Sequence, residues 1–261
     1  QQLKTDLGIE GIITVKVDAT EAQKSEWIQM CLNLGIHLLT APTVAELPVN
    51  GIRSATSLKG SDFIPDGMNG FERNTKRIID CILAAILLVV FSPLILLCWI
   101  LVKREDGGPA IYKQERIGRF GRPFNIYKFR SMRLDAEKMG PALFSGDEDP
   151  RLTKIGKFLR LHHLDELPQL WNVFVGDMAF IGPRPERQFY IDQIMERDPR
   201  YTYLYQIRPG VTSYATLRNG YTDTIEKMVR RLEFDLYYLR HRSIWFDMKI
   251  LWQTFASIAF G

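Results

Sequence analysis

The 261-residue sequence has few cysteines and no cysteine motif. Cys31, Cys81 and Cys98 form no C-x-x-C pair, and two of them lie in the most apolar stretch of the chain. This spacing argues against a disulfide framework and against a structural zinc site, and it fits a reducing compartment. The sequence also lacks a G-x-G-x-x-G pattern, so it gives no sign of a dinucleotide site.

Neither sign of charge dominates the whole chain, which has 34 Lys and Arg against 30 Asp and Glu, a net charge of +4. With 46% hydrophobic residues, this composition excludes a disordered chain, a collagen-like fibre and a multi-span transporter. Residues 103–133, however, hold nine Lys and Arg against three acids, a local charge of +6. We expect this block to meet anionic lipid headgroups or a phosphorylated substrate. Nucleic acid is not an expected partner, because the rest of the chain has no basic surplus.

The first 46 residues predict a small α/β piece. Residues 11–18 alternate as a short strand, residues 20–34 show helical spacing, and residues 36–39 form a second short apolar strand. This order favours a parallel βαβ unit. Residues 47–72 are rich in Gly, Pro, Ser and Asn, and we interpret them as a linker.

The next segment is strongly apolar. Residues 81–102 contain no charge over 22 positions, which is long enough for a helix to cross a bilayer. Ser92 and Pro93 interrupt it, and proline breaks or kinks a helix. Basic pairs at 76–77 and 103–104 flank both ends, which favours keeping both ends on the cytoplasmic side. A helix that enters one leaflet and returns satisfies both observations; a kinked single span and a buried helix of a soluble protein are the alternatives.

The remainder predicts a mostly helical α/β domain with one small β-hairpin, over residues 110–132. Residues 152–161 have the pattern of a basic amphipathic helix, residues 164–175 predict a helix starting near Asp165, and residues 225–260 predict long helices. The last of these is amphipathic, with the apolar residues Trp245, Phe246, Leu251, Trp252 and Phe255. Its apolar side suits a membrane interface, and packing against the protein's own core explains it almost equally well.

Asp165 and Glu166 are the candidate centre of the chemistry. An Asp-Glu pair at a helix start is ordinarily a capping feature. Two arginines favour a phosphate site instead: Arg160 lies just upstream, and Arg184 lies in a rigid Pro-Arg-Pro loop. Carboxylates also bind magnesium in company with substrate phosphates. Together these residues suit phosphoryl transfer.

His162 and His163 next to the carboxylates suggest a competing transition-metal site, as in a metal-dependent phosphohydrolase. Adjacent residues on a helix point in different directions, which makes shared ligation a poor fit. We expect these histidines to serve local packing or surface hydrogen bonds.

Five segments together resemble a known family: KRIIDCILAAILLVVFSPLILL, YKQERIGRFGRPFNIYKFRSM, DPRLTKIGKFLR, LDELPQLWNVFVGDMAFIGPRPE and RPGVTS, in this order. They are similar to the bacterial sugar transferases, the monotopic polyprenyl-phosphate phosphoglycosyl transferases. The likeness implies a re-entrant membrane helix over residues 73–104, broken at Ser-Pro, and a catalytic domain with interfacial helices over residues 105–261. The piece at residues 1–46 resembles the tail of the Rossmann-like domain that precedes the catalytic domain in larger members.

The resemblance implies transfer of a sugar 1-phosphate from a UDP-sugar to undecaprenyl phosphate, with release of UMP. Asp165 would be the nucleophile that forms a covalent phosphosugar-aspartate, and Glu166 would help to hold Mg²⁺. The candidate phosphate contacts are basic residues of the matching motifs: Lys128, Arg130, Arg160 and Arg184.

The same resemblance implies a place on the cytoplasmic face of the bacterial inner membrane, among its lipids, at the start of exopolysaccharide, capsule or O-antigen synthesis. A homodimer is expected. The competing class is a catalytically silent membrane scaffold of polysaccharide assembly. One departure concerns the Arg208-Pro209-Gly210 turn, which continues as VTSYAT where family members commonly have ITGWAQ.

Overall fold

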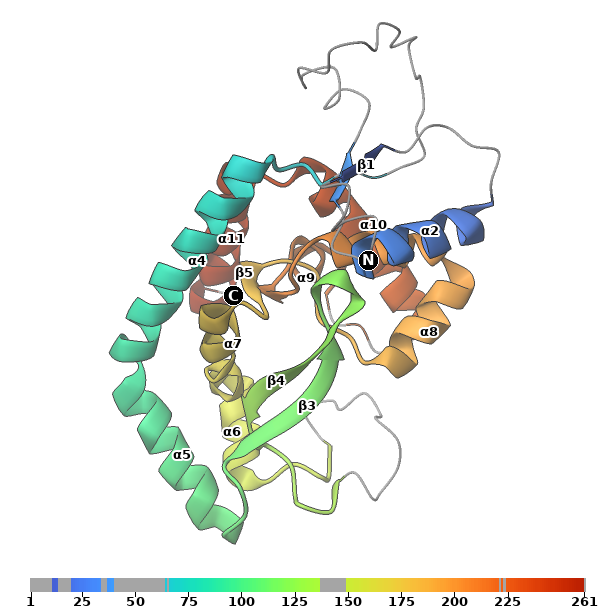
Figure 1. The fold of residues 1–261 in the computed structure, drawn as a ribbon. Coiled ribbons are helices and arrows are strands. Elements are labelled where there is room, and N and C mark those ends of the chain that lie inside the picture. The colour runs from blue at the N-terminus through green and yellow to red at the C-terminus, as the bar shows by residue number, and fades with distance from the viewer. Residues whose placement is uncertain are drawn as a thin grey trace, which may run out of the picture. The chain divides into compact units, whose positions relative to one another are not determined.

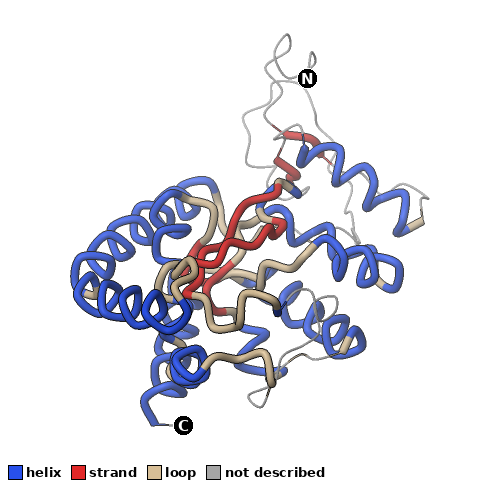
Figure 2. Tube along the Cα trace, turned by 90° about the horizontal axis from the view of Figure 1, so that it is seen from below, coloured by secondary structure: helices blue, strands red, loops and turns tan. Residues whose placement is uncertain are grey.

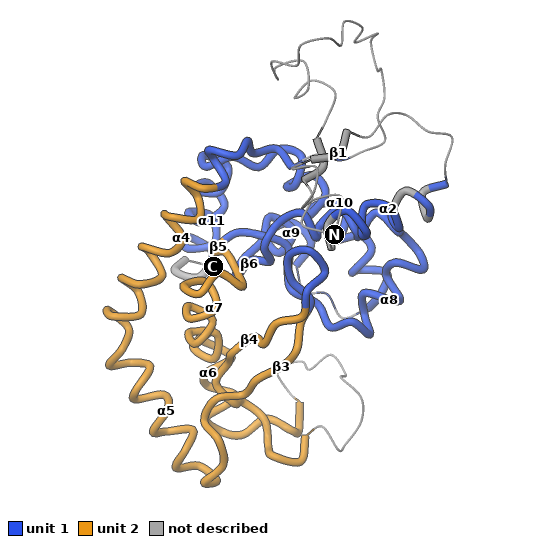
Figure 3. Tube along the Cα trace, viewed as in Figure 1, with its two compact units in different colours: residues 1–73, 117–122, 181–261 blue, residues 74–116, 123–180 orange. Residues whose placement is uncertain are grey.

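The structure is a computed structural model in which helices make up most of the described chain and strands form three short pairs (Figure 2). It describes residues 11–13, 20–33, 37–39, 64, 66–136, 149–220, 222 and 224–260. The chain forms two compact units (Figure 3). Unit 1 comprises residues 1–73, 117–122 and 181–261, and unit 2 comprises residues 74–116 and 123–180.

The N-terminal piece of unit 1 has the predicted parallel βαβ order. Strands β1 (Gly11–Ile13) and β2 (His37–Leu39) pair in parallel, and helix α2 (Glu21–Asn33) connects them. Ser25 anchors α2, since its hydroxyl donates to the Pro199 carbonyl at 2.7 Å, at the start of η4 (Pro199–Gln206). The parallel pair is therefore confirmed, whereas most of the predicted linker lies outside the described residues.

The apolar segment forms two helices, α4 (Gly70–Val90) and α5 (Ser92–Asp106), which meet at a bend of 62° (Figure 1). The break falls at the predicted Ser-Pro: Pro93 lies in the first turn of α5, where its missing N–H is tolerated. The Ser92 hydroxyl donates to the Val89 carbonyl at 2.8 Å. Within the described chain, neither helix alone has the length and apolar composition to cross a bilayer, and only this bent pair meets that criterion jointly.

Unit 2 continues with the predicted hairpin, formed by β3 (Ile111–Ile117) and β4 (Pro123–Phe129). Helix α6 (Lys154–Leu161) packs against α5, as the amphipathic pattern requires. The core between α5, the hairpin and α6 consists of buried apolar side chains around the large Phe129: Cys98, Val102, Ala110 and Leu159.

The helix predicted over residues 164–175 is interrupted. The structure has a short 3₁₀ turn, η3 (Leu164–Glu166), and then helix α7 (Gln169–Val175), which follows Pro168. The reason is Pro168, which has no N–H to donate to the Leu164 carbonyl and so cannot continue a helix begun there. Asp165 is therefore not the N-cap of a helix, and the prediction that a helix begins there is wrong.

Strand β5 (Ala179–Ile181), where the chain passes from unit 2 into unit 1, pairs with β6 (Gly210–Thr212), and four helices complete unit 1. These helices are α8 (Gln188–Arg197), α9 (Tyr214–Asn219), α10 (Ile225–His241) and α11 (Ile244–Phe260). Helix α10 is central, because it packs against α8, α9 and η4. Thr224 caps it, accepting from the Lys227 amide at 3.2 Å.

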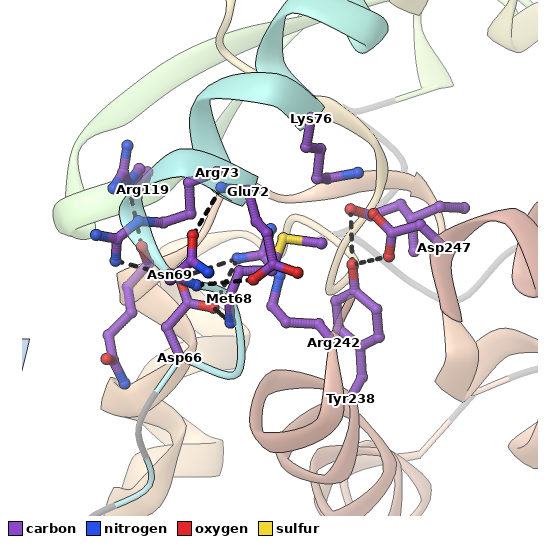
Figure 4. Close-up of polar contacts among 12 residues, drawn as sticks. Asp66, Met68, Asn69, Glu72, Arg73, Lys76, Arg119, Tyr238, Arg242 and Asp247 are labelled. Atoms are coloured by element: carbon purple, nitrogen blue, oxygen red, sulfur yellow. Dashed lines mark hydrogen bonds and ion pairs between the residues drawn. The ribbon is translucent and has the colours of Figure 1, made fainter. Parts of the chain in front are cut away.

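A buried carboxylate, Asp66, ties the chain before α4 to the end of α10 (Figure 4). Its oxygens accept from the Arg242 guanidinium at 3.2 Å and from the Met68 amide at 3.0 Å, and Arg73 lies at 3.5 Å. The side chains of Asp66 and Arg242 are only 6% and 7% exposed. Gly67 fits closely here, because a Cβ would lie 2.5 Å from the Arg240 carbonyl oxygen.

Replacement of this carboxylate is expected to destabilise unit 1. Asp66→Asn takes the ion-paired carboxylate away from buried Arg242 and should cost about 3 kcal/mol. The exposed pair Arg133–Asp135 provides the control, since Asp135→Asn should cost under about 0.5 kcal/mol. Urea unfolding in detergent micelles, followed by tryptophan fluorescence, measures both; equal losses would contradict the role given to Asp66.

Candidate functional site

The two candidate carboxylates sit together on η3 in unit 2 and differ in exposure. Asp165 is 7% exposed, whereas the Glu166 side chain retains 25%. Lys128 on β4 reaches this pair, and its Nζ lies 2.6 Å from Glu166 Oε1. The structure thus brings a strand lysine and two carboxylates into one polar cluster.

The environment of Asp165 disfavours its charge, and nearby cations partly restore it. Burial raises the pKa of Asp165 above its ordinary value, and the neighbouring Glu166 carboxylate raises it further. The positive charges of Lys128, Arg160 and His163 act the other way on this pKa. A carboxylate poised in this manner is typical of groups that take part in chemistry.

Arg160 enters the cluster from the last turn of α6. Its Nε donates to the Ser131 hydroxyl at 3.0 Å, and its charge acts on the pKa of Asp165. Gly156 makes this approach of α6 possible, because a Cβ there would lie 2.0 Å from the Ser131 carbonyl oxygen. His163 then turns the chain from α6 into η3 with a φ of 54°, in the left-handed region.

Asn172 is a site residue that sequence reasoning missed. It is fully buried on α7; its Oδ1 accepts from the Tyr127 amide at 3.0 Å and its Nδ2 donates to the Asn125 carbonyl at 2.7 Å. These bonds occupy the backbone of β4 directly before Lys128. A lone Asn in the apolar helix sequence QLWNVFV was the available signal, since a buried amide needs partners.

Arg130, a predicted phosphate contact, is bonded to groups of the protein itself. It is 7% exposed and pairs with the Asp106 carboxylate, and it also donates to the Val102 carbonyl. Gly108 leaves room for this guanidinium, because a Cβ there would lie 2.0 Å from Arg130 Nη1. Arg130 therefore joins β4 to the C-terminal end of α5, a position where a cation is favourable.

Arg184 belongs to unit 1, where it is the exposed residue of the loop between β5 and α8. Its neighbours Pro183 and Pro185 are buried. The predicted loop is therefore present, and its arginine is exposed.

The basic pair at 76–77, directly before the apolar segment, is bonded to groups of the protein itself. Lys76 pairs with Asp80, and Arg77 donates to the Val173 and Phe174 carbonyls of α7, each at 2.7 Å.

His162 and His163 are exposed, and the His162 ring lies against Phe158 at 4.6 Å between centroids. Within the described residues, no three His, Cys, Asp or Glu side chains converge as a metal cluster. The donors at η3 are two adjacent carboxylates, which are hard oxygen ligands. Such a pair fits Mg²⁺ held jointly with substrate phosphates and water better than a transition metal.

A family comparison gives this arrangement its class. The model of the bacterial sugar transferases matches residues 71–261, which include both η3 and the Pro-Arg-Pro loop. The chain belongs to the bacterial sugar transferase family. The resemblance seen in the sequence motifs is thereby confirmed.

Individual relatives are similar over the same region. The UDP-N-acetylgalactosamine-undecaprenyl-phosphate N-acetylgalactosaminephosphotransferase of Aeromonas hydrophila is 41% identical over 71% of this chain and 44% of its own length. The UDP-glucose:undecaprenyl-phosphate glucose-1-phosphate transferase of Escherichia coli is 40% identical over 72% and 40%. A Caulobacter vibrioides enzyme of the same name is 41% identical over 70% and 69%. The chain thus matches about two fifths of the first two relatives.

The cluster predicts a measurable change in Asp165. Lys128→Gln removes the largest influence that lowers the pKa of Asp165, so this pKa should rise above its wild-type value. Lys128→Arg keeps a cation there and should leave it nearly unchanged. Carboxyl-carbon NMR of protein labelled at aspartate follows the titration. Lys113→Gln, on the exposed face of β3, is the control; an equal rise in that variant would refute the assignment.

Proposed function

We propose that this chain transfers a sugar 1-phosphate from a UDP-sugar to undecaprenyl phosphate and releases UMP. The observation that carries the proposal is the buried Asp165 beside the Lys128–Glu166 ion pair. Family membership supports the reaction class, and the names of its relatives support both substrates. The silent-scaffold alternative has no feature of the described residues in its favour.

In the first proposed step, a carboxylate oxygen of Asp165 attacks the β-phosphorus of the donor. The bond from this phosphorus to the oxygen bridging the two phosphates breaks, and UMP leaves with that oxygen. Burial strips water from the attacking carboxylate, while Lys128 and Arg160 favour its ionised form. The product is an acyl phosphate that carries the sugar.

In the second proposed step, a phosphate oxygen of undecaprenyl phosphate attacks the same phosphorus. The bond to Asp165 breaks, the carboxylate returns, and a polyprenyl diphosphate sugar leaves. Both steps transfer the same phosphoryl group, so one set of cations serves both. Lys128 and Arg160 are the cations of unit 2 that suit this role, and Arg184 is the candidate from unit 1.

Magnesium is part of the proposal, with Glu166 as its protein ligand. When bound with the donor's phosphates, Mg²⁺ would neutralise charge on the diphosphate. Lys128 holds Glu166 in place through the 2.6 Å contact, so the ligand is oriented by the protein before substrate arrives.

We further propose that α4 and α5 enter one leaflet of the cytoplasmic membrane and return, with the catalytic region on the cytoplasmic face. The bend of 62° at Ser92-Pro93 and the exposed apolar side chains support this. Between residues 78 and 101, the large exposed apolar side chains of the pair and its break are Ile78, Ile79, Ile82, Ile86, Val89, Val90, Phe91, Leu96, Leu97, Trp99 and Leu101. Exposed Lys103 and Arg104 at the end of α5 suit lipid headgroups. On α11, exposed Trp245, Trp252 and Phe255 suit the interface.

The nucleophile is tested by labelling and by product release. Wild-type protein with Mg²⁺ and a UDP-sugar carrying ³²P at the β-position should retain label and release about one UMP per protein without acceptor. Added undecaprenyl phosphate should discharge the label into lipid. Asp165→Asn should retain no label and lose at least about 10³-fold in turnover, because the attacking group is gone.

The donor sugar is identified by testing UDP-glucose, UDP-galactose and their N-acetylamino forms in turn. His162→Ala is the control, since His162 is exposed on Phe158, and it should keep wild-type turnover. Label retained by Asp165→Asn would remove this residue from the nucleophile role. Turnover that needs both substrates together, with no labelled protein, would replace the covalent route by direct transfer. Absence of UMP from every donor, with folded protein, would overturn the reaction.

A further inference from the structure

The loop that carries Arg184 is clamped on both sides by backbone hydrogen bonds in unit 1. The Gly182 amide donates to the Thr212 carbonyl at 3.2 Å, and the Gly210 amide donates to the Pro183 carbonyl at 2.9 Å. The two glycines are required by this close approach, because a Cβ on Gly182 would lie 2.3 Å from the Arg208 carbonyl oxygen. The start of the loop is therefore rigid.

The end of the loop is fixed by Glu186, directly after Pro185. Its carbonyl accepts from the Ile117 amide at 3.0 Å. Its carboxylate, 4% exposed, lies 2.5 Å from the Arg231 guanidinium on α10. Since Pro183, Pro185 and Glu186 are buried and Arg184 is exposed, the arginine is the one outward side chain between them.

Arg231 serves two carboxylates and a hydroxyl. Besides Glu186, it contacts Asp235 at 3.7 Å and donates to the Thr222 hydroxyl at 3.0 Å. Burial is the main cause that raises the pKa of Asp235 to about 7. The two carboxylates thus compete for one cation in an enclosed site, and only Glu186 belongs to the arginine loop.

We propose that Glu186 and Arg231 are positioning residues that act on the donor through Arg184. The inference rests on the proposed function, in which Arg184 meets the diphosphate of the UDP-sugar. Two prolines remove backbone freedom around Arg184, and the buried ion pair holds the chain directly after them. Without the pair, Arg184 keeps its charge but loses its fixed backbone, so its contact with a phosphate becomes costlier in entropy.

A double-mutant cycle on UDP affinity, measured by calorimetry in detergent, tests this action through Arg184. Arg184→Gln should weaken UDP binding about 30-fold and Glu186→Gln about 10-fold, within the range for contacts to charged groups. The double variant should bind no more weakly than Arg184→Gln alone, because the positioned group is already absent. Multiplication of the two losses would overturn the proposal.

Asp235→Asn is the matched control. It also takes a carboxylate from Arg231, but Asp235 lies on α10 and not on the loop, so UDP affinity should stay within about twofold of wild type. A loss equal to that of Glu186→Gln would indicate a general effect of destabilising unit 1, and would overturn the positioning role. Arg231→Gln should weaken UDP binding, and Arg231→Lys, which keeps a cation beside Glu186, should recover part of that affinity. The absence of any recovery would also overturn the positioning role.

Thermal unfolding of each variant shows whether it is folded. If Glu186→Gln does not fold, a second double-mutant cycle combines Arg231→Lys with Arg184→Gln. Failure of the two ideas is distinguishable. Folded wild-type protein that neither binds UDP nor releases UMP overturns the proposed function and this inference with it. Normal UDP binding with independent losses overturns the positioning role alone.

Discussion

The contact between Lys128 and Glu166 is the interaction on which the polar part of unit 2 depends. Burying Asp165 next to Glu166 brings two like charges together where water screens them poorly. Lys128 offsets this repulsion, and the register of β4 places it there. Phe129 turns into the core of unit 2, so its neighbour Lys128 points to the other face of the strand. Asn172 holds the same strand by its backbone, which makes the lysine's position a property of the fold.

Prolines decide where the chain changes direction, and their effects differ in how far sequence predicts them. Ser92-Pro93 in a long apolar run predicts a break, and the helices there meet at 62°. Pro168 lies within the helix predicted over residues 164–175, whereas α7 starts only after it. Pro93 stands in the first turn of α5, whereas Pro168 is the residue directly before α7. Periodicity alone does not determine which residue begins a helix over so short a segment.

Local patterns predicted the elements well, because helices, the hairpin and the parallel pair depend on neighbours along the chain. The contacts that hold the candidate residues and their loops in place depend on residues far apart in sequence. Arg130 pairs with Asp106, Asn172 binds the backbone at Asn125, and Glu186 pairs with Arg231 on α10. A single sequence carries no record of such pairings. The motif resemblance identified Asp165, Glu166 and Lys128 as candidates, but not the residues that hold them.

The basic block of residues 103–133 changes meaning once its side chains are placed. Five of its nine cations are exposed: Lys103, Arg104, Lys113, Arg122 and Arg133. Lys128 and Arg130 are tied to carboxylates within unit 2, whereas Arg119 lies half-buried in unit 1. Burial and the charges of Arg208 and Arg73 lower the pKa of Arg119 to about 10. A charge count over consecutive residues therefore combines solvated cations with cations that hold the fold, and only the solvated ones can contact headgroups directly.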